Sequence, residues 1–432
     1  MKKLFTFFFF LLFMMCVLSA CQKETAPLRI CLDIPDRCGS EQTSAVFQRF
    51  LASVAEKGGP SDVEVEYIPQ EGENRKNALT HLRTEIMAKS GPDLFILCTE
   101  YRNDTVFLYP EKAMENRLVL PLTKYMEDSS CTDWNALIPQ IMDAGKYNDE
   151  QYLIPISFTF PVTCYSQSDF EHTPSSEYNW DNIVSSDNLF LRNSEALIGG
   201  AENKLASIGS DNFSGLLGTF ADYEKEELLF SEEDLKKYIG EYLDLYDFSR
   251  NGGFGSLPEH FQANVSVPFW NNAYAAGGGS SKLTNEVLTI VPQYNRNGGV
   301  TATIFDYACI NANTSRGEDA FFILDHLMER SFQQNSELFQ YIFFTWDGAP
   351  VDAELMSAKY PISGQCMSEN NFEQYQKTRD AITAVNFYSK INKYLDTLMF
   401  DCVDIVSGYA QGDIDELVKE TYRAMRMDLA ES

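Results

Sequence analysis

The fold class of this chain follows from residues 28–67, LRICLDIPDRCGSEQTSAVFQRFLASVAEKGGPSDVEVEY. The first seven of these residues place an apolar side chain at every second position, which is typical of a strand with one buried face. Residues 41–57 then space their apolar side chains as one face of a helix, and Gly58-Gly59-Pro60 ends that helix. The alternation in residues 63–67 predicts a second strand.

The same order continues beyond this stretch. Residues 75–89 predict a second helix, Gly91-Pro92 ends it, and DLFILC (93–98) predicts a buried strand. Strands that alternate with helices in this way form a mostly parallel sheet with helices on its faces. Three further amphipathic helices are predicted later in the chain, at residues 232–247, 317–330 and 413–429.

The N-terminus predicts export and lipid attachment. A short basic start precedes an uncharged apolar stretch, residues 4–20, which is typical of a signal peptide. The following Leu-Ser-Ala-Cys resembles the lipobox of bacterial lipoproteins. We therefore expect residues 1–20 to be cleaved, Cys21 to carry a lipid, and residues 21–27 to form a tether on the extracellular face of the membrane. An uncleaved anchor helix is the alternative.

Length and charge narrow the class of protein. A chain of 432 residues is too long for one ordinary core and suggests two lobes. The chain has 34 Lys and Arg but 63 Asp and Glu. This excess of negative charge makes nucleic acid an improbable partner and disfavours flat adhesion to an anionic bilayer. Ten cysteines are present without any C-x-x-C pair. Cys31 and Cys38 would close the shortest disulfide loop, but the pairing stays open.

Enzyme motifs are missing from the sequence. It contains no H-E-x-x-H, G-x-S-x-G, Walker P-loop or EF-hand loop. Two of the four histidines, His81 and His326, fall within predicted helices, where a lone His is usually a surface or core residue. We expect no catalytic residue, metal or cofactor. An extracellular glycosidase is a remaining alternative, although with 63 acids the sequence cannot single out a catalytic carboxylate pair.

Aromatic residues in polar settings favour a binding protein. Trp270 lies in PFWNN (268–272) and Trp346 in TWDG (345–348). An aromatic face beside Asn or Asp suits a sugar, because the ring stacks on C–H groups while the amide or carboxylate bonds the hydroxyls. The alternative is a Trp packed at a lobe edge. Trp134 and Trp180 are expected to be structural.

Six stretches in order carry a family resemblance. They are RTEIMAKSGPDLFIL (83–97), RLVLPLTKYME (117–127), GKYNDEQYLIPIS (145–157), Asn179-Trp180-Asp181, ACINANTSRGEDAFFILDHLMER (308–330) and GAPVDAEL (348–355). Together they resemble the extracellular solute-binding proteins of ABC importers, family 1, carbohydrate type, in their lipoprotein form.

The resemblance implies an α/β fold of two lobes, like that of periplasmic binding proteins. Each lobe would hold a mostly parallel sheet flanked by helices, with a hinge of two or three crossing segments. Residues 28–156 plus 304–347 would form lobe 1, and residues 157–303 plus 348–432 would form lobe 2. A small solute, a sugar or oligosaccharide being favoured, would be captured between the lobes by hinge closure and delivered to ABC permease subunits in the membrane.

The resemblance also implies a set of ligand-binding side chains. They are Glu100, Tyr101, Asp104, Phe158, Thr159, Trp270, Asn271, Asp306, Tyr307, Trp346 and Asp347. Two nearby stretches, SFTFPVTCYSQSDF (157–170) and HFQANVSVPFW (260–270), depart from the family pattern and leave the substrate class open. A non-sugar solute such as a peptide is one alternative, and a surface sensor or interaction lipoprotein with the same fold is another.

Overall fold

The structure is a computed structural model. It describes residues 26–34, 40–98, 104–160, 162–166, 213–248, 265–267, 288–292, 294–335, 349–352, 361–362, 365–366 and 376–432. The signal peptide and Cys21 lie outside these residues. Within the described part of the chain, no helix is both long and apolar enough to cross a membrane.

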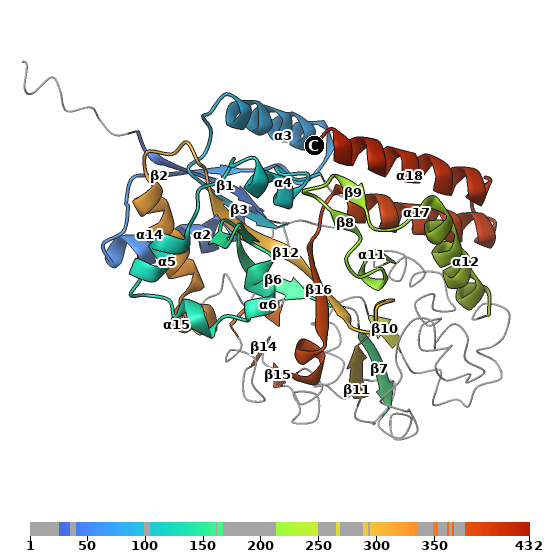
Figure 1. The fold of residues 1–432 in the computed structure, drawn as a ribbon. Coiled ribbons are helices and arrows are strands. Elements are labelled where there is room, and N and C mark those ends of the chain that lie inside the picture. The colour runs from blue at the N-terminus through green and yellow to red at the C-terminus, as the bar shows by residue number, and fades with distance from the viewer. Residues whose placement is uncertain are drawn as a thin grey trace, which may run out of the picture.

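One large sheet combines strands from the early and the late parts of the chain (Figure 1). Its strands run in the order β13-β6-β12-β3-β1-β2, and β16 also pairs with β12. Their bounds are β1 Leu28–Asp33, β2 Val63–Tyr67, β3 Leu94–Cys98, β6 Ile154–Thr159, β12 Val300–Ile310, β13 Ala349–Pro350 and β16 Ile382–Phe387. The three strands expected from the sequence, β1, β2 and β3, are parallel to one another, whereas β12 is antiparallel to β3 and to β6.

Helices flank this sheet, and the predicted ones are present. The helix predicted at 41–57 is α2 (Ser40–Glu56), that at 75–89 is α3 (Gly72–Met87), and that at 317–330 is α14 (Gly317–Met328). Shorter helices complete the layer: α4 Pro110–Glu115, α5 Thr123–Asp128, η1 Trp134–Ala136, α6 Pro139–Asp143 and α15 Arg330–Asn335. A small hairpin joins β4 (Lys146–Tyr147) to β5 (Glu150–Gln151).

The apolar faces of the sheet and helices form one large core. Ile30 and Ile96 on the sheet and Phe47 on α2 are fully or almost fully buried there. Trp134 packs its ring 5.9 Å from that of Phe321, which confirms that it is structural. Cys31 is a buried free thiol, and Cys38, the partner considered for it, lies outside the described residues.

A second core is built from helices. It joins α11 (Phe213–Leu216), α12 (Glu232–Phe248), α17 (Lys390–Ser407) and α18 (Ile414–Ala430), which lie together in Figure 1. The predictions for 232–247 and 413–429 are confirmed by α12 and α18. Ser389 and Asn392 form a capping box at the start of α17, and Gly408, with φ of 80°, ends it.

The remaining strands form small separate sheets. β8 (Ala221–Asp222) pairs with β9 (Glu227–Leu228), and β14 (Pro361–Ile362) pairs with β15 (Gln365–Cys366). β7 (Val162–Ser166) lies between β10 (Val265–Val267) and β11 (Leu288–Pro292) and is antiparallel to both. For this part of the chain we expected a mostly parallel sheet, and the three described strands differ from that expectation.

Two stretches that carry the family resemblance meet in space. Gly91, with φ of 105°, turns the chain from α3 towards β3. The side chain of Asn311 donates hydrogen bonds to the backbone oxygens of Ser90 (3.0 Å) and Pro92 (2.9 Å). Thr314 donates to the carboxylate of Asp93 at 2.5 Å. The Gly-Pro-Asp turn and the Asn-Ala-Asn-Thr segment therefore fix the start of β3 against the end of β12.

β12 connects the two halves of the sheet. Its first residues pair with β16 and with the end of β6, and its last residues pair with β3. The lobe boundaries predicted at 156/157 and 303/304 fall within β6 and β12. The division into two lobes stays a prediction at this point.

Candidate functional site

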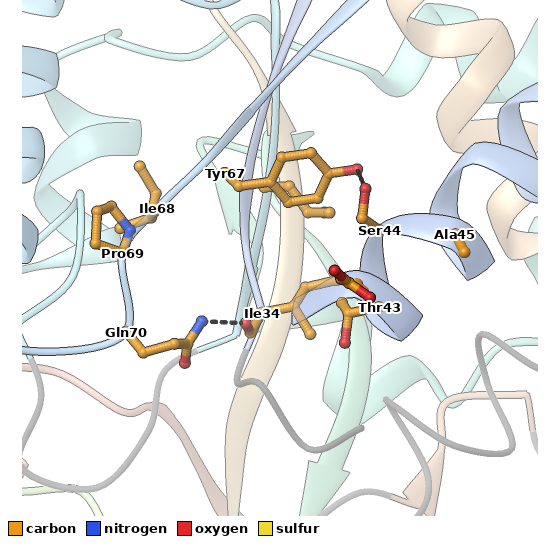
Figure 2. Close-up of a pocket in the computed structure, with 10 residues that line it drawn as sticks. Ile34, Thr43, Ser44, Ala45, Tyr67, Ile68, Pro69 and Gln70 are labelled. Atoms are coloured by element: carbon orange, nitrogen blue, oxygen red, sulfur yellow. Dashed lines mark hydrogen bonds between the residues drawn. The ribbon is translucent and has the colours of Figure 1, made fainter. Parts of the chain in front are cut away.

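The carboxyl ends of β1 and β2 open into a pocket beside the start of α2 (Figure 2). Its volume is about 650 Å³. Ligands of open α/β sheets bind outside the carboxyl ends of the strands, where the loops leave room. The pocket is lined by Leu32, Ile34, Glu41, Thr43, Ser44, Ala45, Tyr67, Ile68, Pro69 and Gln70.

The lining combines one aromatic ring with several polar groups. Tyr67 is 39% exposed, and its phenol oxygen accepts a hydrogen bond from the Ser44 hydroxyl at 3.2 Å. The Gln70 amide donates to the backbone oxygen of Ile34 at 2.8 Å. Both bonds are drawn in Figure 2. Glu41 adds an exposed carboxylate in the first turn of α2. A ring face with hydroxyl, amide and carboxylate groups around it suits a ligand that carries several hydroxyls.

A buried ion pair supports this edge of the sheet. The guanidinium of Arg75 donates to both carboxylate oxygens of Asp33, at 2.8 and 2.9 Å. It also donates to the backbone oxygens of Pro69 (3.1 Å) and Asp104 (2.7 Å). Such two-pronged pairs fix geometry as well as charge. Arg75 therefore holds three chain segments together: the end of β1, the loop after β2, and the segment at Asp104.

Four of the predicted site residues lie on β6 and β12. The strand register pairs Thr159 with Thr303, and Phe158 with Ile304. Phe158 and Tyr307 have no exposed surface and belong to the large core. A solute could contact these two rings only after the surrounding strands move. Their role in ligand binding stays a prediction.

Asp306 is also buried, with 2% of its surface exposed. It accepts a hydrogen bond from the Ser157 hydroxyl across the two strands. Asp306 also lies opposite Cys98, the last residue of β3. The structure thus places it at the same edge of the sheet as the Tyr67 pocket, although it does not line that pocket.

Among the predicted site residues that the structure describes, Asp104 is the exposed one. Its carboxylate accepts a hydrogen bond from the Lys393 ammonium at 2.9 Å. Partial burial raises the pKa of Asp104, but the bond and the charge of Lys393 outweigh this, so the pKa lies below its usual value. Lys393 belongs to α17, and the pair therefore links the edge of the sheet to the helical core.

The other six predicted site residues lie outside the described residues. They are Glu100, Tyr101, Trp270, Asn271, Trp346 and Asp347. The sequence analysis in turn missed the whole lining of the Tyr67 pocket. The alternation in VEVEY, which ends on Tyr67, was the signal that could have pointed to it.

A second hollow of about 770 Å³ lies among helices instead of at strand ends. It is formed by α3, α4 and the C-terminal end of α18, with the exposed side chain of Met87 at its wall. Its lining also carries charged side chains, among them Arg83, Lys112 and Asp428, but it does not lie at the carboxyl ends of β1 and β2, where open α/β sheets bind ligands. We therefore take the Tyr67 pocket as the candidate site.

The fold is shared with many solved structures. The sugar-binding protein MalE from Xanthomonas citri matches with a TM-score of 0.60 at 13% identity, over 94% of this chain and 98% of that chain. An ABC transporter solute-binding protein from Agrobacterium radiobacter, in complex with ribitol, matches with a TM-score of 0.56 at 15% identity, over 93% and 99%. The fold is that of the two-lobed solute-binding proteins. The resemblance noted in the sequence is confirmed as far as the fold is concerned.

A de novo designed cysteine esterase has the same fold, with a TM-score of 0.58 at 13% identity over 94% of this chain and 98% of that chain. Most of the similar structures are nevertheless described as solute-binding proteins. At these identities the likeness shows the fold alone. No family model and no curated protein matches the sequence.

Proposed function

We propose that this chain is the substrate-binding protein of an ABC importer. It captures a small solute in a cleft between two lobes and carries out no covalent step. The observation that supports this most is the Tyr67 pocket, which opens at the carboxyl ends of β1 and β2 in a fold shared with solute-binding proteins and would form the lobe 1 wall of that cleft. A half-exposed ring and several polar groups meet at a place where such sheets bind ligands.

The proposed ligand is a sugar, oligosaccharide or polyol. The Tyr67 ring offers a stacking face, and Ser44, Gln70 and Glu41 offer partners for hydroxyl groups. Proteins of this fold include one described as sugar-binding and one bound to ribitol. A non-sugar solute such as a peptide is the alternative.

The proposed closure uses β6 and β12 as crossing strands between the lobes. Lobe 1 comprises residues 28–156 plus 304–347, and lobe 2 comprises residues 157–303 plus 348–432. The Asp104–Lys393 ion pair then joins lobe 1 to lobe 2. Such a pair, half exposed to solvent, contributes little stability and so can open and re-form as the lobes move.

The proposed location is the outer face of the membrane, with a lipid on Cys21 as anchor. Proteins of this fold are described as periplasmic or extracellular. A tether of residues 21–27 would keep the pocket within reach of membrane-embedded permease subunits. The sensor alternative has the same anchor and differs only in what receives the bound solute.

A thermal-shift screen tests the proposal. The panel contains monosaccharides, oligosaccharides and polyols, with amino acids and short peptides beside them. A ligand at a hundred times its Kd stabilises by about 2.7 kcal/mol, which raises the melting temperature by several degrees. A shift with one sugar or polyol class is expected. A shift with peptides alone would favour the alternative solute, and no shift with any compound would contradict solute capture.

Uptake of the labelled solute by cells with and without this protein separates import from sensing. Import predicts that uptake is lost with the protein. Unchanged uptake together with tight binding would favour the sensor.

A further inference from the structure

Cys131, His326 and Glu329 bring three metal-ligating atoms together from two distant parts of the chain. The Sγ, imidazole and carboxylate atoms all lie within 4.8 Å of one another. His326 Nδ1 is 3.0 Å from Glu329 Oε2, and Cys131 Sγ is 3.5 Å from the same oxygen. We expected no metal role for His326 from its place in a helix. The structure changes that expectation, because the folded chain brings the thiol of Cys131 next to His326 and Glu329.

In one tautomer of His326, Nε2 carries the proton and Nδ1, which lies 3.0 Å from Glu329 Oε2 and 3.3 Å from the Lys57 ammonium, keeps its lone pair. The Ser53 hydroxyl donates to the backbone oxygen of Phe50 at 2.7 Å, so its oxygen accepts from His326 Nε2 at 3.3 Å. A His that donates through one nitrogen to a fixed partner and presents the other as a ligand is the usual arrangement in metal sites.

The ammonium group of Lys57 already lies beside two of these three side chains. The Lys57 ammonium lies 2.6 Å from Glu329 Oε2 and 3.3 Å from His326 Nδ1, and it donates to both acceptors. The group also lies at the C-terminal end of α14, where the helix dipole favours positive charge. Lys57 itself is half exposed and ends a flexible side chain, so it can move into solvent.

The loop that carries Cys131 is held against α14 by three hydrogen bonds. Ser129 and Thr132 donate to the Asp325 carboxylate, at 2.7 and 3.2 Å, and the Thr132 hydroxyl donates to the Asp325 backbone oxygen at 2.6 Å. His326 is buried, whereas Cys131 is exposed and opens the group to solvent. The ligands are therefore positioned in advance, with an entry path on one side.

We propose that Cys131, His326 and Glu329 bind a thiophilic divalent cation, with zinc as the best fit, after Lys57 swings out. Tetrahedral zinc bonds of about 2.0–2.3 Å separate ligand atoms by roughly 3.3–3.8 Å. The ligand atoms, all within 4.8 Å of one another, therefore need to shift by about 1 Å at most, with His326 Nδ1 and Glu329 Oε2 moving slightly apart from 3.0 Å. A water supplies the fourth ligand. A neutral imidazole and a thiolate select zinc over calcium or magnesium, which prefer oxygen ligands.

Binding releases one proton. Zinc binds the thiolate form of a cysteine, so the S–H proton of Cys131 has to leave when the metal binds. The S–H bond breaks, the sulfur pair forms the bond to zinc, and the proton leaves to solvent. Zinc affinity is therefore expected to rise with pH.

The site is separate from the proposed ligand pocket. The pocket lies at the start of α2 and Lys57 follows its end, which places them roughly 20 Å apart at 1.5 Å per residue. Zinc would tie the Cys131 loop to α14 and stabilise the large core without contacting the solute.

Zinc titration by calorimetry tests the proposal on the whole chain, with Cys131→Ser as the main variant. Cys131 is exposed, so this variant is expected to fold. His81→Asn is the matched control, because His81 lies near Glu85 (3.9 Å) on the surface of α3. The wild type and His81→Asn should bind one zinc ion more than Cys131→Ser does. Cobalt should give a thiolate charge-transfer band in the wild type that Cys131→Ser lacks.

Lys57→Met supplies the decisive variant. It removes the competing ammonium, and zinc affinity should increase about tenfold. Equal zinc binding by the wild type and Cys131→Ser, or no increase with Lys57→Met, would overturn the proposal. The readouts are independent of solute binding, so a failed solute screen leaves this test intact.

Discussion

The Tyr67 pocket and the paired strands β6 and β12 both combine aromatic and polar side chains, but they use them differently. At the pocket, Tyr67 is 39% exposed. On the strands, Phe158 is completely buried, and Ser157 bonds Asp306 inside the sheet. An aromatic residue beside a polar one therefore identifies a binding surface only when both reach solvent. Between the strands the same pairing is part of the core.

The two regions therefore have separate roles. Buried and mutually bonded groups fix how β6 and β12 lie against each other. The groups around Tyr67 remain available to a solute because the parallel strands end there. Substitutions on the strands should therefore change stability, and substitutions at the pocket should change binding.

The largest expected effect is that of Phe158→Ala. Removing a fully buried ring leaves a cavity, so the free energy of unfolding should fall by about 3–5 kcal/mol. Urea denaturation measures the change. Phe322→Ala is the matched control, because Phe322 is 39% exposed on α14 and should cost far less. Equal losses for both variants would contradict the assignment of Phe158 to the core.

Arg75→Ala should have the next largest effect. It leaves the Asp33 carboxylate buried without its partner, which costs about 3 kcal/mol. Lys146→Ala, which breaks the exposed pair with Asp143, serves as the control and should change stability by less than about 0.5 kcal/mol. If the two variants melted at the same temperature, Arg75 would not support the edge of the sheet as we describe.

Much of the fold was predictable because its signals are local. The alternation of residues 28–34 and 63–67 and the helical spacing of 41–57 each reflect one buried face, and the structure contains all three elements. The Gly-Pro-Asp turn was predictable for the same reason, since only a few residue types allow it. The five predicted helices lie within a few residues of their expected bounds.

The site was less predictable because it depends on which strand ends lie side by side. Tyr67 and Ser44 are 23 positions apart and meet only when β2 lies beside β1. Phe158 and Tyr307 were chosen from their family positions, and sequence alone could not reveal that the register of β6 and β12 buries them. α17 was not predicted; in the second core it packs against α18, which follows it directly, and against the distant helices α11 and α12.

Glu111 provides a pH test of the junction between the two cores. Burial raises the pKa of its carboxyl group to about 8, and the backbone N–H of Phe387 donates to it. Its Oε2 has no partner among the described residues. Because the folded state keeps the proton longer than the unfolded state does, stability should fall as pH rises from about 4.3 to about 8.

Melting temperatures between pH 4 and 9 measure this effect, with Glu111→Gln as the comparison. The variant has no proton to lose, so its stability should decline less over that range, and the gap to the wild type should be largest at pH 8. A parallel pH profile for the two proteins would show that Glu111 is ionised in the folded state.

Tyr67→Ala is expected to cause the smallest free-energy change of these substitutions. It is also the most direct test of solute capture at the pocket. Calorimetry with the sugar or polyol that gives the largest thermal shift compares it with Tyr409→Ala, whose ring is exposed at the end of α17. We expect Tyr67→Ala to bind at least about tenfold more weakly, a loss of about 1.4 kcal/mol, with an unchanged melting temperature, and Tyr409→Ala to bind as the wild type does. Unchanged affinity in Tyr67→Ala would contradict the assignment of this pocket as the binding site.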